Sequence, residues 1–302
     1  MTQDRGHLLT EQQNQRSMHI DRMNIGEAFD VINGEDRTVA GAVERAKPQI
    51  CDAIRCVVRA FERGGRLFYV GAGTSGRLGV IDSAECPPTF MTPPEMVQGI
   101  IAGGDQAIRR SIEGAEDHTD DAVKAITQCE VTTEDVVLGI ATGGTTPFVH
   151  AALAEAKRRG AETIFFACVP GHAQEDAADI SIRVLTGPEV ITGSTRMKAG
   201  TATKMVLNMI TTISMIQIGK VFGNLMVDLN RDACAKLRDR AIRIVQSATN
   251  TSRDEAEQLL RHGEDVKTAI VMHFKIADRK EASRMLLEAG GRLGDIIERN
   301  DD

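Results

Sequence analysis

Short apolar runs alternate with amphipathic stretches through the middle of this 302-residue chain. After helical periodicity at residues 21–62, five apolar runs follow at 67–70, 97–102, 136–141, 163–169 and 180–185. The runs have the length of strands, whereas the segments between them have helical periodicity. Strands that alternate with helices typically build a parallel sheet covered by helices on both faces. The pattern therefore predicts an α/β fold around a parallel sheet.

The hydrophobic pattern also divides the chain into three predicted parts. Residues 1–62 form an N-terminal helical segment, of which residues 1–20 are polar and are expected to be poorly ordered or wrapped on a partner. Residues 63–228 hold the predicted sheet. Residues 229–302 are highly charged, contain no strand-like run after Lys236, and predict a small bundle of three short helices.

Cap residues mark the helices of this last part. Ser252, followed by Glu255, is typical of a capping box, and Asp278 is a related acidic cap. Gly263 and the pair Gly290-Gly291 stand where C-terminal caps are expected.

Composition excludes several classes of function. The net charge of −7 and the aromatic content of 3% favour neither nucleic acid nor an anionic membrane as a partner. Six scattered Cys without a C-x-x-C pair predict free thiols in a reducing cytoplasm, and the seven His show no spacing typical of a metal site. The N-terminus lacks an apolar signal core, and the longest apolar stretch, residues 205–218, is too short to span a bilayer.

Residues 66–90 carry the strongest functional signal. The first predicted strand ends in Gly71-Ala72-Gly73-Thr74-Ser75-Gly76, and residues 77–84 predict a short helix that stops before Pro87-Pro88. Backbone N–H groups at a helix N-terminus attract anions, and hydroxyls add hydrogen bonds. Thr74, Ser75 and Gly76 are therefore predicted to bind a phosphate. With Glu85 one short helix away, the segment suits an enzyme that holds a phosphate and moves protons.

The same turn matches the dinucleotide-binding fingerprint, with Gly71, Gly73 and Gly76 in the required positions. That fingerprint also needs a full crossover helix and an acidic residue at the end of the second strand. Here the two prolines shorten the predicted helix, and the first carboxylate after the second run, Asp105, comes too late. A smaller phosphate ligand is favoured over a nicotinamide cofactor.

Two further turns rich in Gly and hydroxyls precede predicted helices. Residues 142–147 follow the third run, and parallel strands would bring this turn to the same crevice as the first. Residues 193–195 precede the long apolar helix, where nearby lysines add positive charge. Ordinary strand-to-helix loops and a solvated cap with surface lysines remain alternatives. The predicted phosphate-binding residues of these turns are Thr145, Thr146, Ser194, Thr195 and Lys198.

A second carboxylate is harder to choose from the residues alone. Glu113 and Glu116 are three residues apart, so they share a helix face if the helix continues through Gly114. By composition, either one is most simply a solvated surface residue, and spacing does not favour Glu116 over Asp117.

Long blocks of sequence resemble a known family. The blocks are GAGTSGRLGVIDSAECPPTF, IAGGD…SIEGAEDH, TGSTRMKAGTATKMVLNMITT and GKVFGNLMVD, with Leu9-Thr-Glu-Gln, Ile32-Asn-Gly-Glu-Asp and Lys267-Thr-Ala-Ile-Val-Met outside them. Together they resemble the N-acetylmuramic acid 6-phosphate etherases, bacterial enzymes of peptidoglycan recycling and amino sugar catabolism built on the sugar isomerase (SIS) domain. The resemblance covers nearly the whole chain. It implies a homodimer of SIS-type α/β subunits with a small helical C-terminal domain, and no metal or organic cofactor.

The resemblance also implies a reaction. The family's substrate is an amino-sugar phosphate, whose D-lactyl ether at carbon 3 is removed by elimination and then hydration. The products are N-acetylglucosamine 6-phosphate and D-lactate. Glu85 matches the family's proton donor and Glu116 its second catalytic carboxylate, so we expect Glu85 to act as the acid and Glu116 as the base. Burial or mutual repulsion would keep one carboxyl protonated while the other is ionised.

One turn departs from the family pattern. The family commonly has Ser-Gly-x-Thr-Pro in the second turn, where this chain has Gly143-Gly144-Thr145-Thr146-Pro147. The missing hydroxyl at Gly143 would be replaced by Thr142, Thr145 or the backbone.

Two other functions compete with an etherase. Sugar-phosphate sensors with etherase-like SIS sequences pair two SIS modules in a longer chain, whereas this chain has room for one. An aldose–ketose isomerase would use similar proton transfers and leave an ether intact. The presence of both Glu85 and Glu116 favours the etherase.

Overall fold

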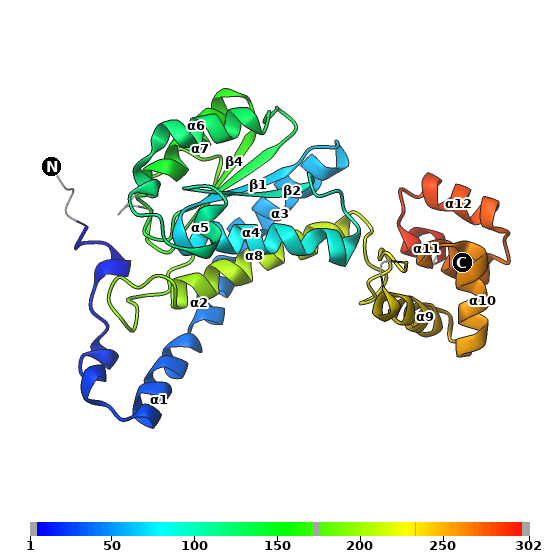
Figure 1. Ribbon diagram of the computed structural model, residues 1–302, viewed down its shortest axis with the longest axis horizontal. Helices are drawn as coiled ribbons and strands as arrows, with labels where there is room; N and C mark the ends of the chain where they lie inside the picture. Colours follow the sequence, from blue (N-terminus) through cyan, green and yellow to red (C-terminus); the bar gives the residue numbers. More distant parts are fainter. Residues whose placement is uncertain (1–4, 172–174, 233, 298–302) are drawn as a thin grey trace. The chain divides into compact units, whose positions relative to one another are not determined.

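The computed structural model describes residues 5–171, 175–232 and 234–297 (Figure 1). The chain forms two compact units. The first comprises Met1–Ala84 and Glu95–Thr211, and the second comprises Glu85–Pro94 and Thr212–Asp302. The N-terminal helical segment thus clusters with the sheet in the first unit, while the three-part division expected from the sequence stays a prediction.

A five-stranded parallel sheet forms the centre of the first unit, as the apolar runs predict. The strand order is β2-β1-β3-β4-β5. The strands are β1 Leu67–Gly71, β2 Val97–Ile101, β3 Val136–Ile140, β4 Glu162–Ala167 and β5 Ile180–Arg183. Every residue of β1 and β3 is buried, which explains why these strands are continuous apolar runs rather than alternating ones.

Helices cover both faces of this sheet. In Figure 1, α6 and α7 lie over one face, and α3, α4 and α8 lie over the other. Phe68 and Val137 of the sheet pack in one core with Ile126 of α6 and Val149 of α7. The helices are α1 Ile25–Asp36, α2 Val39–Arg45, α3 Lys47–Glu62, α4 Gly73–Phe90, α5 Gln106–Arg109, α6 Thr119–Gln128, α7 Pro147–Arg158 and α8 Lys198–Gln217.

Helix α4 is longer than the sequence predicts. It begins at Gly73 rather than Arg77, and it continues through Pro87 and Pro88 to Phe90. The expected stop at the prolines was wrong, because the φ of proline suits a helix and its carbonyl oxygen can still accept a hydrogen bond. The N–H of Met91 donates to the Pro87 carbonyl at 2.9 Å, which closes the last turn.

The N-terminal arm, residues 5–22, is folded against its own chain. It contains three short 3₁₀ helices, η1 Leu9–Glu11, η2 Gln15–Ser17 and η3 Ile20–Arg22. Asn14 Nδ2 donates to the Pro188 carbonyl at 3.2 Å, and Ser17 Oγ donates to the Val190 carbonyl at 2.7 Å. The expectation of poor order was therefore wrong for residues 5–20, because their partners are distant in sequence. The part of that expectation on residues 1–4 lies outside the described residues.

The second unit contains a bundle of short helices with its own core. They are α9 Ala235–Thr249, α10 Arg253–Gly263, α11 Val266–Lys275, α12 Arg279–Glu288 and α13 Leu293–Ile297. Val245, Leu260 and Ile270 lie in this core.

The bundle is small and helical as predicted, but the expected number of helices was wrong. The Ser252 capping box and the Asp278 cap are confirmed. Five helices replace the expected three in the described part. Two of the breaks fall at Glu264 and Ile276, which adopt φ of 65° and 49°. Gly263, the expected C-terminal cap, is the last residue of α10 and lies one position before the first break. No glycine or proline marks the break at Ile276, so the sequence gives no local signal for that turn.

Candidate functional site

The first predicted phosphate turn joins β1 to α4 with almost no space between backbones. A Cβ at Gly71 would lie 2.6 Å from the Gly76 nitrogen, and a Cβ at Gly76 would lie 2.6 Å from Ile101 Cγ1. Glycine is therefore required at both positions. Because α4 begins at Gly73, the free N–H groups of its first turn and the Thr74 and Ser75 side chains gather at the carboxyl end of β1.

The second turn lies at the same edge of the sheet. Strand β3 pairs directly with β1, with Gly71 opposite Ile140, so the two turns leave neighbouring strands at the same level. Thr146 is the N-cap of α7, and both Thr145 and Thr146 are half-buried. His150 Nε2 lies 2.7 Å from the Gly144 carbonyl oxygen and fastens the turn to α7.

The third turn precedes α8 and lies beside the first. A Cβ at Gly200 would lie 3.6 Å from Thr74 Cγ2, so the first turn of α8 faces the first turn of α4. Ser194 and Thr195 are half-buried at this position. The structure thus brings the three hydroxyl-bearing turns together at one end of the sheet. Their contact with a phosphate stays a prediction.

A buried carboxylate caps α8. Glu189 accepts hydrogen bonds from the N–H groups of Lys198 and Ala199 at 3.0 and 2.9 Å. Burial raises the pKa of Glu189, while these two hydrogen bonds oppose the increase. The sequence analysis did not single out Glu189, because local spacing gives no sign that its side chain folds back on the helix start.

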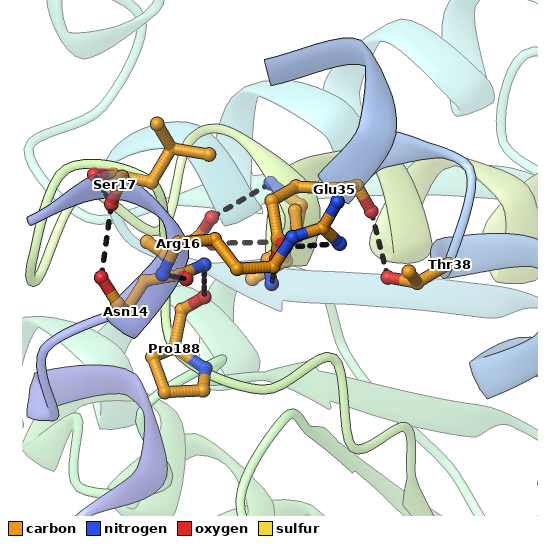
Figure 2. Close-up of polar contacts among 10 residues, drawn as sticks. Asn14, Arg16, Ser17, Glu35, Thr38 and Pro188 are labelled. Carbon is orange, nitrogen blue, oxygen red and sulfur yellow. Dashed lines mark hydrogen bonds and ion pairs between the residues drawn. The ribbon is translucent and has the colours of Figure 1, made fainter. Parts of the chain in front are cut away.

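Lys198 lies in a buried ion pair at this helix start. Its side chain is 2% exposed, and Nζ lies 2.6 Å from Glu35 Oε2. Figure 2 shows Glu35 beside Arg16, whose Nη1 lies 3.0 Å from Glu35 Oε1. Burial alone would raise the pKa of Glu35, but the Lys198 hydrogen bond and the Lys198 and Arg16 charges hold it below its usual value. The phosphate-binding role of Lys198 stays a prediction, with its amino group bound to Glu35.

The N-terminal arm reaches the second and third turns. A Cβ at Gly143 would lie 3.7 Å from Thr10 Oγ1, and a Cβ at Gly193 would lie 3.2 Å from Glu11 Oε2. The Gly193 N–H donates to the Thr10 carbonyl at 3.2 Å. The sequence did not predict these contacts, because the arm is polar and has no hydrophobic pattern that indicates packing. The signal that could have found them is the family resemblance, since Thr10, Glu11 and Glu35 all belong to its blocks.

Asp82 of α4 is hydrogen-bonded to residues of β1 and α8. Tyr69 Oη donates to Asp82 Oδ2 at 2.9 Å, and Asn208 and Thr211 of α8 donate to Oδ1. Burial raises the pKa of this carboxyl, against the effect of the three hydrogen bonds. The network fixes β1, α4 and α8 relative to one another, which holds the first and third turns in place.

Glu116 faces the first turn across a small pocket. The pocket measures about 180 Å³ and is lined by Ala72, Gly73, Arg77 and residues 111–116, among others. The expected shared helix face of Glu113 and Glu116 was wrong, because α5 ends at Arg109 and Gly114 adopts a φ of 74°. A short 3₁₀ helix, η4 Ala115–Asp117, carries Glu116 instead.

Glu85 lies further along α4 from the turn. Its side chain is exposed, and it belongs to the second compact unit. It does not line the small pocket. A larger pocket of about 580 Å³ lies along β2 and is lined by Gly99, Lys124 and Phe148, among others, but by none of the predicted site residues.

Within residues 5–171, 175–232 and 234–297, no group of His, Cys, Asp and Glu has the arrangement of a metal site. None of the helices in these ranges is both long and apolar enough to cross a membrane.

Two family models match parts of this chain. The SIS domain family matches residues 118–213, and the N-terminal SIS domain of glucokinase regulatory protein matches residues 49–157. The phosphoheptose isomerase structure from Neisseria gonorrhoeae is 16% identical, covers 63% of this chain and 98% of its own, and has a TM-score of 0.48. The phosphoheptose isomerase structure from Francisella tularensis is 18% identical, covers 63% of this chain and 100% of its own, and has a TM-score of 0.44.

Full-length relatives are much closer in sequence. The N-acetylmuramic acid 6-phosphate etherase of Picosynechococcus is 52% identical over 96% of this chain and 97% of its own length. The protein of the same name from Trichormus variabilis is 53% identical over 98% of this chain and 96% of its own length. The resemblance found in the sequence blocks is thereby confirmed, and the chain belongs to the N-acetylmuramic acid 6-phosphate etherase family.

Proposed function

We propose that this chain is a carbon–oxygen lyase that cleaves the D-lactyl ether of N-acetylmuramic acid 6-phosphate to N-acetylglucosamine 6-phosphate and D-lactate. The observation that carries the proposal is the 52% identity with an etherase over 96% of the chain. The pocket that Glu116 lines beside the Gly73 turn supports it from the structure. No residue of the family's catalytic pair is missing here, since both Glu85 and Glu116 are present.

The sugar phosphate is assigned to the three converging turns. The first-turn N–H groups of α4 supply hydrogen bonds and a favourable dipole for an anion. Hydroxyls surround that position and add further donors. They belong to Thr74, Ser75, Thr145, Thr146, Ser194 and Thr195.

Two carboxylates then carry the chemistry. In the open-chain aldehyde, the carbonyl at carbon 1 acidifies the carbon 2 proton. Glu116 removes this proton, the released electron pair forms the carbon 2–carbon 3 double bond, and the carbon 3–oxygen bond breaks. Glu85 donates a proton to the departing lactate oxygen. Glu85 then takes a proton from water that adds to carbon 3, and Glu116 returns its proton to carbon 2.

A homodimer in the cytoplasm is part of the proposal. It is supported by the family resemblance and by an apolar face of α1 that the described residues leave exposed. Ile25 and Phe29 on this face are 91% and 64% exposed. Six cysteines without a disulfide among the described residues fit a reducing compartment. Light scattering of the pure protein, compared with a Phe29→Glu variant, tests the dimer.

D-lactate release tests the activity. The pure protein is incubated with N-acetylmuramic acid 6-phosphate in the presence of a chelator, and D-lactate is assayed enzymatically. We expect turnover without added metal or nucleotide. Tight sugar-phosphate binding without lactate release would instead support a sensor.

A further inference from the structure

Arg77 is anchored at the small pocket by one edge of its guanidinium. Its Nε donates to the Ile108 carbonyl at 3.2 Å, and its Nη2 donates to the Arg110 carbonyl at 3.1 Å. These two donors form the side-on edge of the planar group. The end-on edge, formed by Nη1 and the second Nη2 hydrogen, makes no hydrogen bond to the described residues. That edge has the geometry that binds a carboxylate through two parallel bonds.

The charge of Arg77 has no ion-pair partner among the described residues. No carboxylate lies within ion-pair distance of it among the described residues, although carbonyl oxygens fix its position. Arg77 is the only cation among the described residues that line the pocket. Glu113, on the same lining, accepts a hydrogen bond from Ser111 Oγ at 2.9 Å. A fixed, half-buried cation that no carboxylate of the described residues contacts is suited to bind an anionic group of a ligand.

We propose that Arg77 binds the carboxylate of the substrate's lactyl group, and that the pocket beside Gly73 is the subsite for this group. The inference rests on the proposed function. Muramic acid differs from glucosamine by a lactyl ether, which adds one carboxylate at carbon 3. The phosphate at carbon 6 is assigned to the N–H groups of the turn that immediately precedes Arg77. Carbon 3 is bonded to carbon 2, whose proton Glu116 is assigned to remove from the same pocket.

This contact makes Arg77 a specificity residue. It recognises the group that the substrate has and that the sugar-phosphate product lacks. The departing lactate keeps its bond to Arg77 while the carbon 3–oxygen bond breaks, so the two products are held by different residues. A role limited to holding residues 108–110 in place would affect ligands with and without the carboxylate alike.

The test compares ligands with and without the carboxylate. Arg77→Met is measured for the KM of N-acetylmuramic acid 6-phosphate and for the calorimetric Kd of N-acetylglucosamine 6-phosphate. Arg109→Met, an exposed position outside the pocket lining, is the matched control. We expect Arg77→Met to raise the substrate KM by roughly ten- to a hundredfold, while the product Kd changes by less than about twofold. Arg77→Lys keeps the positive charge but loses the two parallel N–H donors. Its substrate KM should lie between those of wild type and Arg77→Met.

Hydrogen exchange distinguishes carboxylate binding by Arg77 from an indirect role in which Arg77 only positions Glu116. Carbon 2 exchange of N-acetylglucosamine 6-phosphate in heavy water should persist in Arg77→Met, because this ligand has no carboxylate. Equal losses for both ligands, together with lost exchange, would show that Arg77 only holds the 108–110 segment and would overturn the proposal. An unchanged substrate KM would overturn it as well.

A change in the ligand keeps the proposal testable if Arg77→Met does not fold. The methyl ester of the lactyl group removes the carboxylate charge and leaves the protein intact. Wild-type protein should bind the ester roughly tenfold or more weakly than the acid, and equal affinities would contradict the proposal. In a folded Arg77→Met variant, acid and ester should bind alike. If wild-type protein releases no lactate, the proposed reaction is wrong. The Arg77 proposal is still tested in that case, because the affinities of the acid and the ester can be compared without turnover.

Discussion

Lys198 Nζ lies 2.6 Å from Glu35 Oε2, and this buried pair joins residues 163 positions apart. It connects α1 to the start of α8, next to the third hydroxyl-bearing turn. The largely exposed Arg16 contacts the other carboxylate oxygen of Glu35, with Nη1 3.0 Å from Oε1 (Figure 2). Removing one member of such a pair leaves a buried charge without compensation, which is costlier than the pair itself is stabilising.

We therefore expect Glu35→Gln to lower the free energy of unfolding by about 3–5 kcal/mol. The reason is the uncompensated Lys198 ammonium, whose side chain is 2% exposed. Urea unfolding measures the effect, with Asp30→Asn on the exposed side of α1 as the control, expected within about 0.5 kcal/mol of wild type. Loss of less than about 1 kcal/mol in Glu35→Gln would mean that the pair is not buried in solution.

Acid should remove the same stabilisation. The pKa of Glu35 lies below its ordinary value of 4.5, so its contribution to stability is fully present above pH 4.5 and is lost as the pH falls through the folded-state pKa. The stability difference between wild type and Glu35→Gln should therefore shrink as the pH falls below about 4.5. Urea midpoints for both proteins between pH 7 and acid test this. A difference that stays constant with pH would contradict it.

The two carboxylates are distinguished by exchange and cleavage together. Glu116→Gln should suppress both carbon 2 exchange of N-acetylglucosamine 6-phosphate and ether cleavage, because the base acts in both. Glu85→Gln should abolish cleavage and leave exchange. Each loss should amount to about 10²–10⁴ in rate. NMR of the carbon 2 proton in heavy water and a lactate assay measure the two steps.

Asp117→Asn is the matched control for Glu116→Gln, because Asp117 lies on the same 3₁₀ helix and does not line the pocket. It should retain both activities. Exchange that survives in Glu116→Gln and disappears in Glu85→Gln would reverse the two roles.

The first turn should contribute to phosphate affinity through its hydroxyls. A hydrogen bond to a charged group is worth about 1.5–3 kcal/mol, so Ser75→Ala should raise the KM by roughly tenfold or more. Steady-state kinetics measure the effect. A Thr74→Ala/Ser75→Ala double variant with an unchanged KM would place the phosphate elsewhere. The half-exposed Ser181 of β5 offers a control, Ser181→Ala, away from the turns.

Gly143→Ser should be tolerated and mildly stabilising. A Cβ at Gly143 makes only an ordinary contact, 3.7 Å from Thr10 Oγ1, and that hydroxyl is buried without a hydrogen-bond partner among the described residues. A serine hydroxyl would supply a partner worth about 0.5–1.5 kcal/mol. Thermal unfolding measures it against Gly143→Ala, which adds the Cβ alone. A lower Tm for the serine variant than for the alanine variant would contradict this account.

The sheet could be predicted from the sequence because its strands are buried on both faces. Runs such as Val136–Ile140 contain no polar residue, and the Gly-rich turns after them mark where strands end. That the first two turns lie at the same edge of the sheet could be predicted, because both follow strands of a parallel sheet. The length of α4 could not be predicted, since Pro87 and Pro88 fall where the helix tolerates them.

The site was less accessible to sequence reasoning because it depends on distant contacts. Nothing local in the polar arm shows that Thr10 lies against Gly143, or that Lys198 is neutralised by Glu35. Only the family resemblance distinguishes Glu116 from its neighbours. Glu113 and Glu116 do not share a helix face, because Gly114 between them adopts an αL conformation. The Arg77 contacts involve backbone carbonyls, which no residue pattern reveals.

The arm's attachment sets an order for events during synthesis. Asn14 and Ser17 bond to carbonyls 174 and 173 residues later, so the arm has no place to dock until that later segment leaves the ribosome. Contacts this distant in sequence close slowly and after local ones. The arm, residues 5–22, therefore stays undocked until residues 188–190 have been synthesised. The contacts of Thr10 with the second and third turns therefore form only after residues 143–193 have been made.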